Sequence, residues 1–209
     1  TAEQWEHAQS VMGTILDNLG VKYDIGIDEA AFYGPKLDIQ YKNVFGKEDT
    51  IVTIQIDMLL AEKFGMEYVD VDGAKKRPYI IHRTSLGCYE RTLAYLIERF
   101  AGALPLWLSP TQVTIMPIAD RHNDFAYEVA SALEKTGMRV DVDTRSEKIG
   151  FKIREAQLSK VNYMLVIGDE EVETKNVSVR CRKRGDIGKM TVADLCDMLE
   201  KEVSEKTIL

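Results

Sequence analysis

The feature that most constrains the fold of this chain is a proline-containing break near its middle, Leu104-Pro-Leu-Trp-Leu-Ser-Pro110. A helix cannot continue through two prolines this close together, because proline lacks a backbone N–H and its ring clashes with the preceding turn. The order of strand-like and helix-like patterns also changes here. We therefore predict two domains, residues 1–108 and 109–209, each of about 100 residues and of ordinary domain size.

The residues before the break predict a helix followed by an antiparallel sheet. Residues 2–19 carry apolar side chains at helical spacing and are followed by Gly20. Strands are predicted at Lys22–Ile27, Lys36–Tyr41, Ile51–Asp57 and Arg77–Arg83. Only a short helix near Leu59–Phe64 separates them, which favours antiparallel pairing. A helix over residues 88–101 completes this α+β part.

The residues after the break alternate between strand and helix. Strands are predicted at Gln112–Ile118, Arg139–Asp143, Tyr163–Ile167 and Asn176–Arg182. Helices are predicted at Asn123–Lys135, Lys148–Lys160 and Val192–Ser204, the last with Thr191 as its N-cap. This alternation indicates an α/β domain with a mixed or mostly parallel sheet flanked by helices. The fold class of the whole chain is α/β.

Composition excludes some functions and leaves others open. No apolar run approaches the roughly 18 residues of a membrane span, so we expect no membrane partner. The three cysteines are widely spaced, which argues against a disulfide framework and favours the cytoplasm. The net charge is −7, yet bases cluster locally, and local clusters make phosphate contacts. RNA binding therefore stays open for the two clusters, Arg145, Lys148, Lys152, Arg154 and Lys160, and Arg180, Arg182, Lys183 and Arg184.

The stretch from His82 to Arg91 joins a strand pattern to a helix pattern through Gly87. Such a junction can aim side chains and free backbone N–H groups at one point, as an anion site needs. Arg91 is the best phosphate candidate, because its planar guanidinium fits phosphate oxygens. The alternative is a pair with an acidic neighbour on the same helix.

Two further stretches carry polar residues of interest. In Ala31-Phe-Tyr-Gly-Pro-Lys36, Tyr33 and Lys36 could line a cleft, although a hairpin turn with a surface lysine is the simpler interpretation. Gln55 shares a strand face with Thr53 and Asp57. That face is either a polar groove for a substrate or, as the pattern alone favours, the solvent side of the sheet.

The histidines alone do not predict a metal site. His82 ends an apolar strand, where a single histidine is usually structural, and no second ligand lies at metal spacing. We expect His7 and His122 to be exposed. Because zinc sites in proteins use at least three protein ligands, the residues by themselves do not define one.

Several motifs occur in order along the whole chain: Phe32-Tyr-Gly-Pro-Lys36, Thr53-Ile-Gln55, Ile81–Arg91, Phe100–Pro110 and Glu147-Lys-Ile-Gly-Phe-Lys-Ile-Arg-Glu155. Together they resemble the C-terminal portion of bacterial-type threonyl-tRNA synthetases, which are class II aminoacyl-tRNA synthetases. The resemblance implies a class II-like antiparallel sheet in the first part and an anticodon-binding domain in the second. It implies a threonine–tRNA ligase that activates threonine with ATP and transfers it to tRNA(Thr).

The resemblance also assigns residues in the first part. Gly87–Arg91 resembles motif 3, which makes Arg91 a catalytic contact of the ATP phosphates, with Gln55 as the second catalytic residue. Tyr33, Lys36 and Gln55 match positions that line the threonine and ATP site. His82 matches one zinc ligand in the threonine pocket, and Mg²⁺ accompanies ATP.

In the second part the resemblance places tRNA anticodon contacts at Arg145, Ser146, Lys160, Glu171 and Arg180. For the basic residues the alternative is an ordinary solvated helix face. The implied partners are tRNA(Thr), ATP and threonine, and the implied assembly of the intact enzyme is a homodimer in the cytoplasm.

The chain also departs from the family pattern. It lacks motifs 1 and 2, the upstream cysteine and histidine ligands of the zinc site, and the editing domain. We therefore expect it to be catalytically incomplete alone. The alternative is a non-catalytic tRNA-binding or regulatory module derived from a synthetase. An unrelated nucleotide-binding protein is disfavoured, because Pro117-Ile-Ala-Asp120 rather than a glycine-rich loop follows the first strand of the second part.

Overall fold

The computed structural model describes residues 1–208, which form two compact units. The first unit is Thr1–Glu98 and the second begins at Arg99, before the predicted boundary. Leu106, in the short 3-10 helix η1 (Leu106–Leu108), is fully buried in the core of the second unit. Its carbonyl accepts a hydrogen bond of 2.9 Å from Gln112 Nε2. The extents 1–108 and 109–209 stay a prediction for the two domains.

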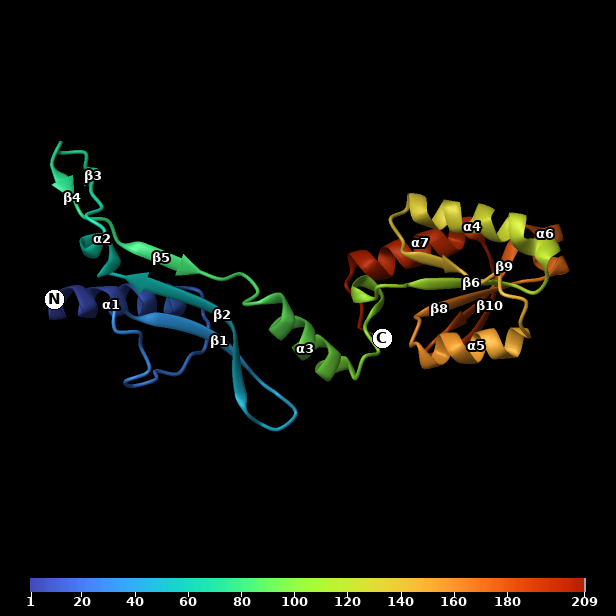
Figure 1. The fold of residues 1–209 in the computed structure, drawn as a ribbon, viewed down its shortest axis with the longest axis horizontal. Helices are drawn as coiled ribbons and strands as arrows, with labels where there is room; N and C mark the ends of the chain where they lie inside the picture. Colours follow the sequence, from blue (N-terminus) through green and yellow to red (C-terminus); the bar gives the residue numbers. More distant parts are fainter. Residues whose placement is uncertain (209) are drawn as a thin grey trace. The chain divides into compact units, whose positions relative to one another are not determined.

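The first unit contains three helices and five strands (Figure 1). In chain order they are α1 (Ala2–Asn18), β1 (Lys36–Lys42), β2 (Glu48–Asp57), α2 (Leu60–Lys63), β3 (Tyr68–Val69), β4 (Lys75–Lys76), β5 (Ile80–Arg83) and α3 (Tyr89–Phe100). β2 lies between β1 and β5 and pairs antiparallel with both. β3 and β4 form a separate two-stranded pair. The predicted antiparallel arrangement is confirmed.

One strand prediction in this unit was wrong, and another began too early. Lys22–Ile27 forms no strand and is exposed. Its alternating pattern has no neighbouring strand to complete a ladder, and strands are stable only when paired. β5 begins at Ile80 rather than at Arg77, because Pro78 has no N–H to donate to a ladder.

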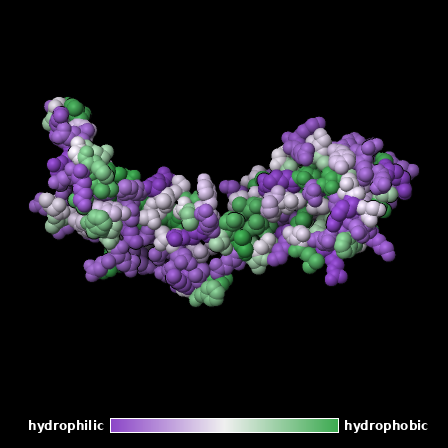
Figure 2. Space-filling model, viewed as in Figure 1, coloured by the Kyte–Doolittle hydropathy of each residue, from purple (hydrophilic) through white to green (hydrophobic). Residues whose placement is uncertain are grey.

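The apolar side of α1 remains largely exposed in this unit. The helix forms as predicted, and Thr1 caps it by accepting from the Gln4 N–H. Ala8 is its buried residue, whereas Val11, Ile15 and Leu19 are 41%, 52% and 69% exposed. Apolar side chains therefore show among polar ones on the surface of this unit (Figure 2).

The second unit contains a five-stranded mixed sheet with helices on both faces (Figure 1). After η1 the elements are β6 (Val113–Pro117), η2 (Asp120–His122), α4 (Asn123–Lys135), β7 (Val140–Val142), α5 (Ile149–Leu158), β8 (Tyr163–Ile167), α6 (Asp169–Thr174), β9 (Asn176–Cys181), β10 (Gly185–Thr191) and α7 (Val192–Ser204). The strand order is β10-β9-β8-β6-β7. β6, β7 and β8 are parallel, and β9 and β10 are antiparallel to their neighbours. The predicted mixed sheet is confirmed.

The main core lies between this sheet and the helices α4 and α7. Leu165 is fully buried at its centre, where it pairs with Ile115 of β6 and Val179 of β9. From the helices come Phe125, Ala126, Val129, Ala130, Leu133, Leu195 and Leu199. A smaller cluster on the other face holds α5 against β6 and β8 through Met116, Met164 and Ala156. The second unit therefore has a conventional two-sided core.

One α-helix and one strand of the second unit were missed by the sequence prediction. α6 is only six residues long and carries the acidic run Asp-Glu-Glu at its start, which suits a helix N-terminus but is short for a periodicity signal. β10 contains Gly185 and Gly188, which weaken a strand. It forms because it pairs along β9, from Gly185 opposite Cys181 to Thr191 opposite Asn176.

Among residues 1–208, no helix combines the length and apolar character that crossing a bilayer requires.

The core position of Leu165 gives a stability prediction. Leu165→Ala should lower the free energy of unfolding of the second unit by about 2–5 kcal/mol, because it removes buried methyl groups and leaves a cavity. Leu158→Ala is the matched control, since Leu158 is 71% exposed, and it should change stability by no more than about 0.5 kcal/mol. Urea unfolding followed by Trp107 fluorescence measures both. Equal effects would contradict the assigned core.

Candidate functional site

Three of the predicted site residues lie together in the middle of the first sheet. Gln55 of β2 is paired with Lys36 of β1 on one side and with His82 of β5 on the other. The Tyr33 hydroxyl donates a hydrogen bond of 2.7 Å to Gln55 Oε1. The rings of Tyr33 and His82 lie 5.9 Å apart between centroids. We call Tyr33, Gln55 and His82 the central cluster.

Gly34 explains how Tyr33 reaches Gln55. The backbone of residues 33–35 continues the ladder of β1 onto β2: the Met58 N–H donates to Tyr33 O and the Ile56 N–H donates to Pro35 O, both at 3.0 Å. A Cβ atom at Gly34 would lie 1.7 Å from Ile56 O. No side chain fits there, so the glycine is a steric requirement of this close backbone approach.

A buried carboxylate holds His82. Asp57 is 0% exposed, and its Oδ2 lies 3.0 Å from His82 Nε2. Its other oxygen, Oδ1, accepts the N–H groups of Leu59 and Leu60 at 2.9 Å each. Burial acts to raise the pKa of Asp57, but the bonds from His82 and from these two N–H groups outweigh it and leave the pKa below its ordinary value.

Lys36 stands beside the cluster but is already engaged. Its Nζ lies 2.6 Å from Asp38 Oδ2, and the Thr53 hydroxyl donates to the other oxygen of Asp38 at 2.7 Å. Lys36 is half-buried. Its charge is therefore shared with a neighbouring carboxylate at the edge of the cluster.

The structure does not bring Arg91 into the central cluster. Arg91 is exposed on α3, and its Nη1 donates to Thr50 O at 3.0 Å. Thr50 precedes Gln55 by five residues along β2, a separation of about 17 Å at the rise of a strand. Gly87, at a φ of 64°, fixes this position, since a Cβ there would lie 2.6 Å from Ile51 O. Arg91 and Gln55 could share only an extended ligand.

The residues present do not complete a zinc site. Within residues 1–208 no group of three histidine, cysteine or carboxylate side chains is arranged to hold a metal ion. His82, with its Nε2 bonded to Asp57, resembles one ligand supported by a carboxylate. Since zinc needs at least three protein ligands, this chain supplies one candidate.

In the second unit, α5 leaves part of one sheet face uncovered. α5 packs on β6 and β8. Met164 of β8 lies in that contact and is paired with Arg180 of β9, so Arg180 points to the same side. Along β9, Val177, Val179 and Cys181 are buried and alternate with more exposed residues. We call the residues on the open side the β9–β10 polar face; they are Ser178, Arg180, Asp186 and Lys189.

Glu171 adjoins this polar face, and Arg180 belongs to it. Glu171 is buried, and its Oε1 accepts from Ser178 Oγ at 2.8 Å and from Lys189 Nζ at 3.1 Å. Arg180 Nη1 lies 3.4 Å from Asp186 Oδ2. Its Nε is buried and has no hydrogen-bond partner among the described residues. The buried Nε is closed to a ligand, but the terminal guanidinium nitrogens, with one long contact to Asp186, keep donor capacity.

Lys160 lies at the end of α5, where it has a φ of 59°. Its backbone carbonyl accepts from Arg182 Nη1, and its Nζ donates to Ala101 O. Arg182 directly follows Cys181, the last residue of β9, so Lys160 is tied to the end of that strand. In the described arrangement its ammonium group is bound internally.

Arg145 and Ser146 lie apart from these residues, in the loop between β7 and α5. Arg145 forms two bonds with Asp143, at 2.9 and 2.8 Å, and one of 2.6 Å with Glu155. These acidic neighbours, Asp143 first, raise the pKa of Arg145 further. Ser146 is exposed. Both residues line a hollow of about 380 Å³ with the loop after β6 and Lys148. The five predicted tRNA contacts therefore form two groups rather than one patch.

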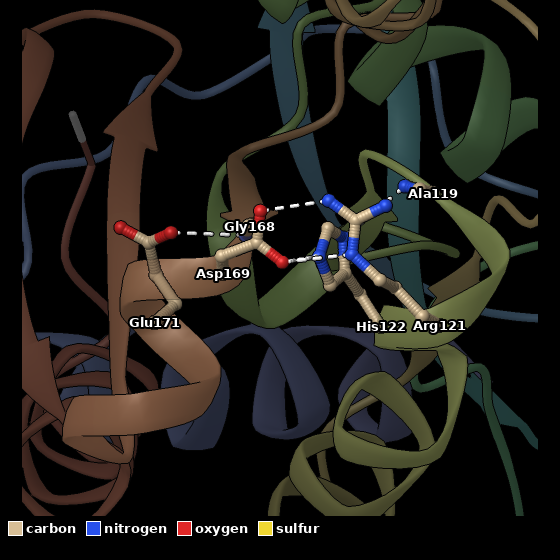
Figure 3. Close-up of polar contacts among 6 residues, drawn as sticks. All are labelled: Ala119, Arg121, His122, Gly168, Asp169 and Glu171. Atoms are coloured by element: carbon tan, nitrogen blue, oxygen red, sulfur yellow. Dashed lines mark hydrogen bonds and ion pairs between the residues drawn. The ribbon is translucent and has the colours of Figure 1, made fainter.

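A cluster that the sequence did not predict joins the loops after β6 and β8 (Figure 3). Arg121 donates to both oxygens of Asp169, at 2.8 and 2.7 Å. His122 Nε2 lies 3.0 Å from Asp169 Oδ1, and its Nδ1 accepts the Ala119 N–H at 3.2 Å. Arg121 and then His122 hold the pKa of Asp169 well below its usual range.

This cluster shows that the prediction for His122 was wrong, and it also helps to position Glu171. His122 is buried rather than exposed, because both of its ring nitrogens have protein partners; His7 is exposed as expected. Glu171 lies two residues after Asp169 on α6. Its Oε2 accepts the Gly168 N–H at 2.9 Å (Figure 3). The cluster thereby braces the start of α6, from which Glu171 reaches Ser178.

Some of the functional residues missed from the sequence had a weak signal. The alternating pattern placed Asp57 on the same strand face as Gln55. It therefore predicted that the two share an environment, but it did not predict that Asp57 is buried. The contacts of Ser178 and Lys189 with Glu171 had no signal, because β10 and α6 were not predicted. Arg121, His122 and Asp169 come from two distant loops, and no local spacing relates them.

Comparison with known proteins agrees with this arrangement. Residues 2–100 match the family described as tRNA synthetase class II core domain (G, H, P, S and T), and residues 112–202 match the family described as Anticodon binding domain. Threonine–tRNA ligases of Clostridium perfringens (strain SM101 / Type A) and Clostridium botulinum (strain Eklund 17B / Type B) are 56% and 54% identical over 204 residues, which is 98% of this chain and 32% of each relative.

A solved structure is also similar. The RNA binding domain of threonyl-tRNA synthetase from Cryptosporidium parvum Iowa II is 36% identical and superposes with a TM-score of 0.84, over 96% of this chain and 51% of that one. With the order of the two family matches, this assigns the chain to the class II aminoacyl-tRNA synthetases, as a part of such a protein. Within that class the chain belongs to the threonyl-tRNA synthetase family. It spans about a third of the length of the curated relatives.

The close approach at Gly34 gives a prediction for the central cluster. Gly34→Ala should displace Tyr33 from Gln55, because the new methyl group would overlap Ile56 O. We expect a loss of about 1–3 kcal/mol in the stability of the first unit, measured by thermal unfolding, and shifted NMR signals of Gln55. Gly13→Ala is the control: this helical position accepts a Cβ at an ordinary 3.5 Å contact and should be neutral or stabilising. If the two variants had the same stability and the same Gln55 signals, glycine would not be required at position 34.

The hydrogen bonds of Glu171 give a pH prediction. Burial acts to raise its pKa, but Ser178, the Gly168 N–H and Lys189 lower it below the ordinary 4.5. A carboxylate whose pKa is lower in the folded state stabilises the fold above its unfolded pKa. That contribution is lost as the pH falls through the folded value. The stability gained from Glu171 should therefore be complete above about pH 4.5 and be lost gradually as the pH falls from there through the lower pKa of the folded state.

The measurement compares urea unfolding of the wild type and Glu171→Gln between pH 7 and pH 3. At pH 7 the variant should be less stable by roughly 1–3 kcal/mol, the range for a hydrogen-bonded charged group, and the gap should close at acidic pH. Glu173→Gln is the control on the same helix, since Glu173 is exposed. A gap that stayed constant with pH would rule out the ionised Glu171 network.

Proposed function

We propose that this chain is the part of a threonine–tRNA ligase that carries motif 3 of the catalytic domain and the anticodon-binding domain, with extents 1–108 and 109–209. The observation that carries the proposal is the central cluster: Tyr33, Gln55 and His82 meet on an antiparallel sheet of the class II type. The family membership of the chain supports it. The reaction would be ATP-dependent activation of threonine and its transfer to tRNA(Thr).

In this proposal each residue of the first unit has a stated task. Tyr33 and Gln55 bind the amino acid side of the site through their hydroxyl and amide groups, and Lys36 lies beside them. Arg91, about 17 Å away along β2, contacts the ATP phosphates, for which a guanidinium is suited. Mg²⁺ bound with ATP would stabilise phosphate charge. The separation of Arg91 from Gln55 suits ATP, because an extended ligand can reach from one to the other.

His82 would contribute one of the ligands of a zinc ion in the threonine pocket. Bound zinc would hold the amino and hydroxyl groups of threonine. Threonine and valine have nearly the same shape, and an apolar pocket separates such pairs poorly, whereas a site that binds the hydroxyl rejects the analogue that lacks it. His82 is 42% exposed on its side chain, which leaves it accessible to such a group.

In the second unit we propose that the anticodon arm of tRNA(Thr) binds along the β9–β10 polar face and the loop before α5. Arg180, whose side chain is 34% exposed, would donate to RNA through its terminal guanidinium nitrogens, since its Nε is buried. Arg145 and Ser146 would contact the same arm from the hollow beside them, while Lys160 and Glu171 frame the face. Arg145 would exchange its present acidic partners for RNA. The intact enzyme would be a homodimer in the cytoplasm.

A second candidate is a non-catalytic tRNA-binding module. One observation favours it: Arg91 and Lys36 are engaged internally, by Thr50 and Asp38, whereas the second unit has a complete core. Both candidates require RNA binding by the second unit. Exchange of pyrophosphate into ATP with threonine present distinguishes them in a protein that contains this segment. Exchange that depends on Arg91 supports the ligase, and absence of exchange in a folded protein that still binds tRNA supports the module.

The division of tasks between the units is testable in this chain. Arg180→Ala should weaken binding of a tRNA(Thr) anticodon stem–loop about tenfold, the size expected for one lost arginine contact. Arg91→Ala is the matched control in the first unit and should leave that affinity unchanged. Fluorescence anisotropy at two or more salt concentrations measures both, since contacts with phosphate make affinity fall with salt. If Arg91→Ala weakened binding as much as Arg180→Ala did, the assignment of RNA binding to the second unit would be wrong.

A further inference from the structure

Asp57 lies beneath the central cluster in a setting that fixes its carboxylate. It is 0% exposed, at the end of β2, opposite Ile80 in the ladder with β5. The N–H groups of Leu59 and Leu60, just before and at the start of α2, both donate to Oδ1 at 2.9 Å. Two backbone donors on one oxygen leave the carboxylate no freedom to rotate. Oδ2 must face His82.

This orientation determines which nitrogen of His82 carries the proton. A carboxylate only accepts hydrogen bonds, so the contact of 3.0 Å between Asp57 Oδ2 and His82 Nε2 requires Nε2–H as the donor. In a neutral imidazole the other nitrogen, Nδ1, is then a bare acceptor. No described residue hydrogen-bonds Nδ1.

We propose that Asp57 is a positioning residue that holds His82 in the Nε2–H form and presents the lone pair of Nδ1 to a ligand of the central cluster. The ligand class is an electron-pair acceptor: a divalent metal ion or a donor N–H or O–H group of the bound amino acid. Partners of this kind fix the ring and tautomer of metal-binding histidines in other proteins. The fixed tautomer is a property of the chain itself, whereas its use at this site rests on the proposed function.

The neighbours of His82 favour this arrangement. The Tyr33 ring lies beside the imidazole at 5.9 Å, and the Tyr33 hydroxyl is bonded to Gln55. One side of the ring is thus held by Asp57 and another faces Tyr33. The side chain still has 42% of its surface accessible. A ring held in place on a partly accessible side chain suits a ligand contact.

The test reads the tautomer of His82 directly. Long-range ¹H–¹⁵N spectra of the whole chain at pH 8, where an ordinary imidazole is neutral, separate the Nε2–H and Nδ1–H forms by their ¹⁵N shifts. His82→Gln identifies the His82 signals among those of the three histidines. We expect His82 in the Nε2–H form. A wild-type His82 in the Nδ1–H form would overturn the proposal without any variant of Asp57.

Asp57→Asn gives the decisive comparison. With the amide oxygen kept by Leu59 and Leu60, its NH₂ group would face Nε2 as a donor, and His82 should change to the Nδ1–H form. Asp70→Asn is the matched control, because Asp70 also accepts a backbone N–H, that of Val71, in the same unit; it should leave His82 unchanged. Retention of the Nε2–H form in a folded Asp57→Asn chain would overturn the proposal.

The outcome is separable from the proposed function. The stem–loop affinity of Asp57→Asn should equal that of the wild type, because tRNA binding is assigned to the second unit. A failed tautomer test with intact RNA binding would reject the positioning by Asp57 alone. Loss of RNA binding by Arg91→Ala would reject the domain assignment while leaving the His82 tautomer intact.

Discussion

The first unit depends on the backbone ladder of β2, which fixes the register of every proposed ligand contact. β2 pairs with β1 and β5 at once, so Lys36, Gln55 and His82 lie in one row across the sheet. A shift of one residue in either pairing would turn these side chains to opposite faces. Near the end of β2, the backbone at Gly34 passes close to Ile56 O, and Asp57 is buried. Both features limit such a shift. The cluster is therefore a consequence of backbone pairing.

The two units reach stability by different means. The second has a continuous apolar core between the sheet, α4 and α7. In the first unit the buried apolar residues are Ala8 and Ala61, and much of its order comes from ladders, turns and polar contacts such as those of Asp57. Local polar contacts give less stabilisation than a packed core. Substitutions at Gly34 or Asp57 should accordingly have larger consequences for the first unit than similar changes on the surface of the second.

The sequence predicted the elements that have strong periodicity and clear ends. Asn123–Lys135 and Val192–Ser204 were predicted with the limits found for α4 and α7, because Gly137 and Thr191 mark ends that depend on local chemistry. Lys22–Ile27 was wrong and β10 was missed for one reason: a strand is defined by its partner. An alternating pattern without a partner forms no strand, whereas a glycine-containing segment beside β9 does.

The same distinction applies to the candidate sites. Residue types and motif order were enough to select Tyr33, Gln55, His82 and Arg91, but not to say which of them meet. Only the structure places Arg91 near Thr50 rather than beside Gln55, and only the structure reveals Asp57 as the partner of His82. Ion pairs between distant loops, such as Arg121 with Asp169, have no signature in one sequence because their spacing is set by the sheet.

Charge in the second unit shows why counting bases does not define an RNA surface. Arg145 is bound by Asp143 and Glu155, Arg121 by Asp169, and Lys189 by Glu170 and Glu171. Much of the basic charge is thus neutralised by neighbours. Arg180 differs, because its contact with Asp186 is long and its Nε is unpaired among the described residues. An unpaired buried donor is unfavourable, but the burial of Nε also keeps an external ligand from it. An RNA acceptor at Arg180 would therefore bind the terminal guanidinium nitrogens and compete with one long contact, whereas at Arg145 it must replace several short hydrogen bonds.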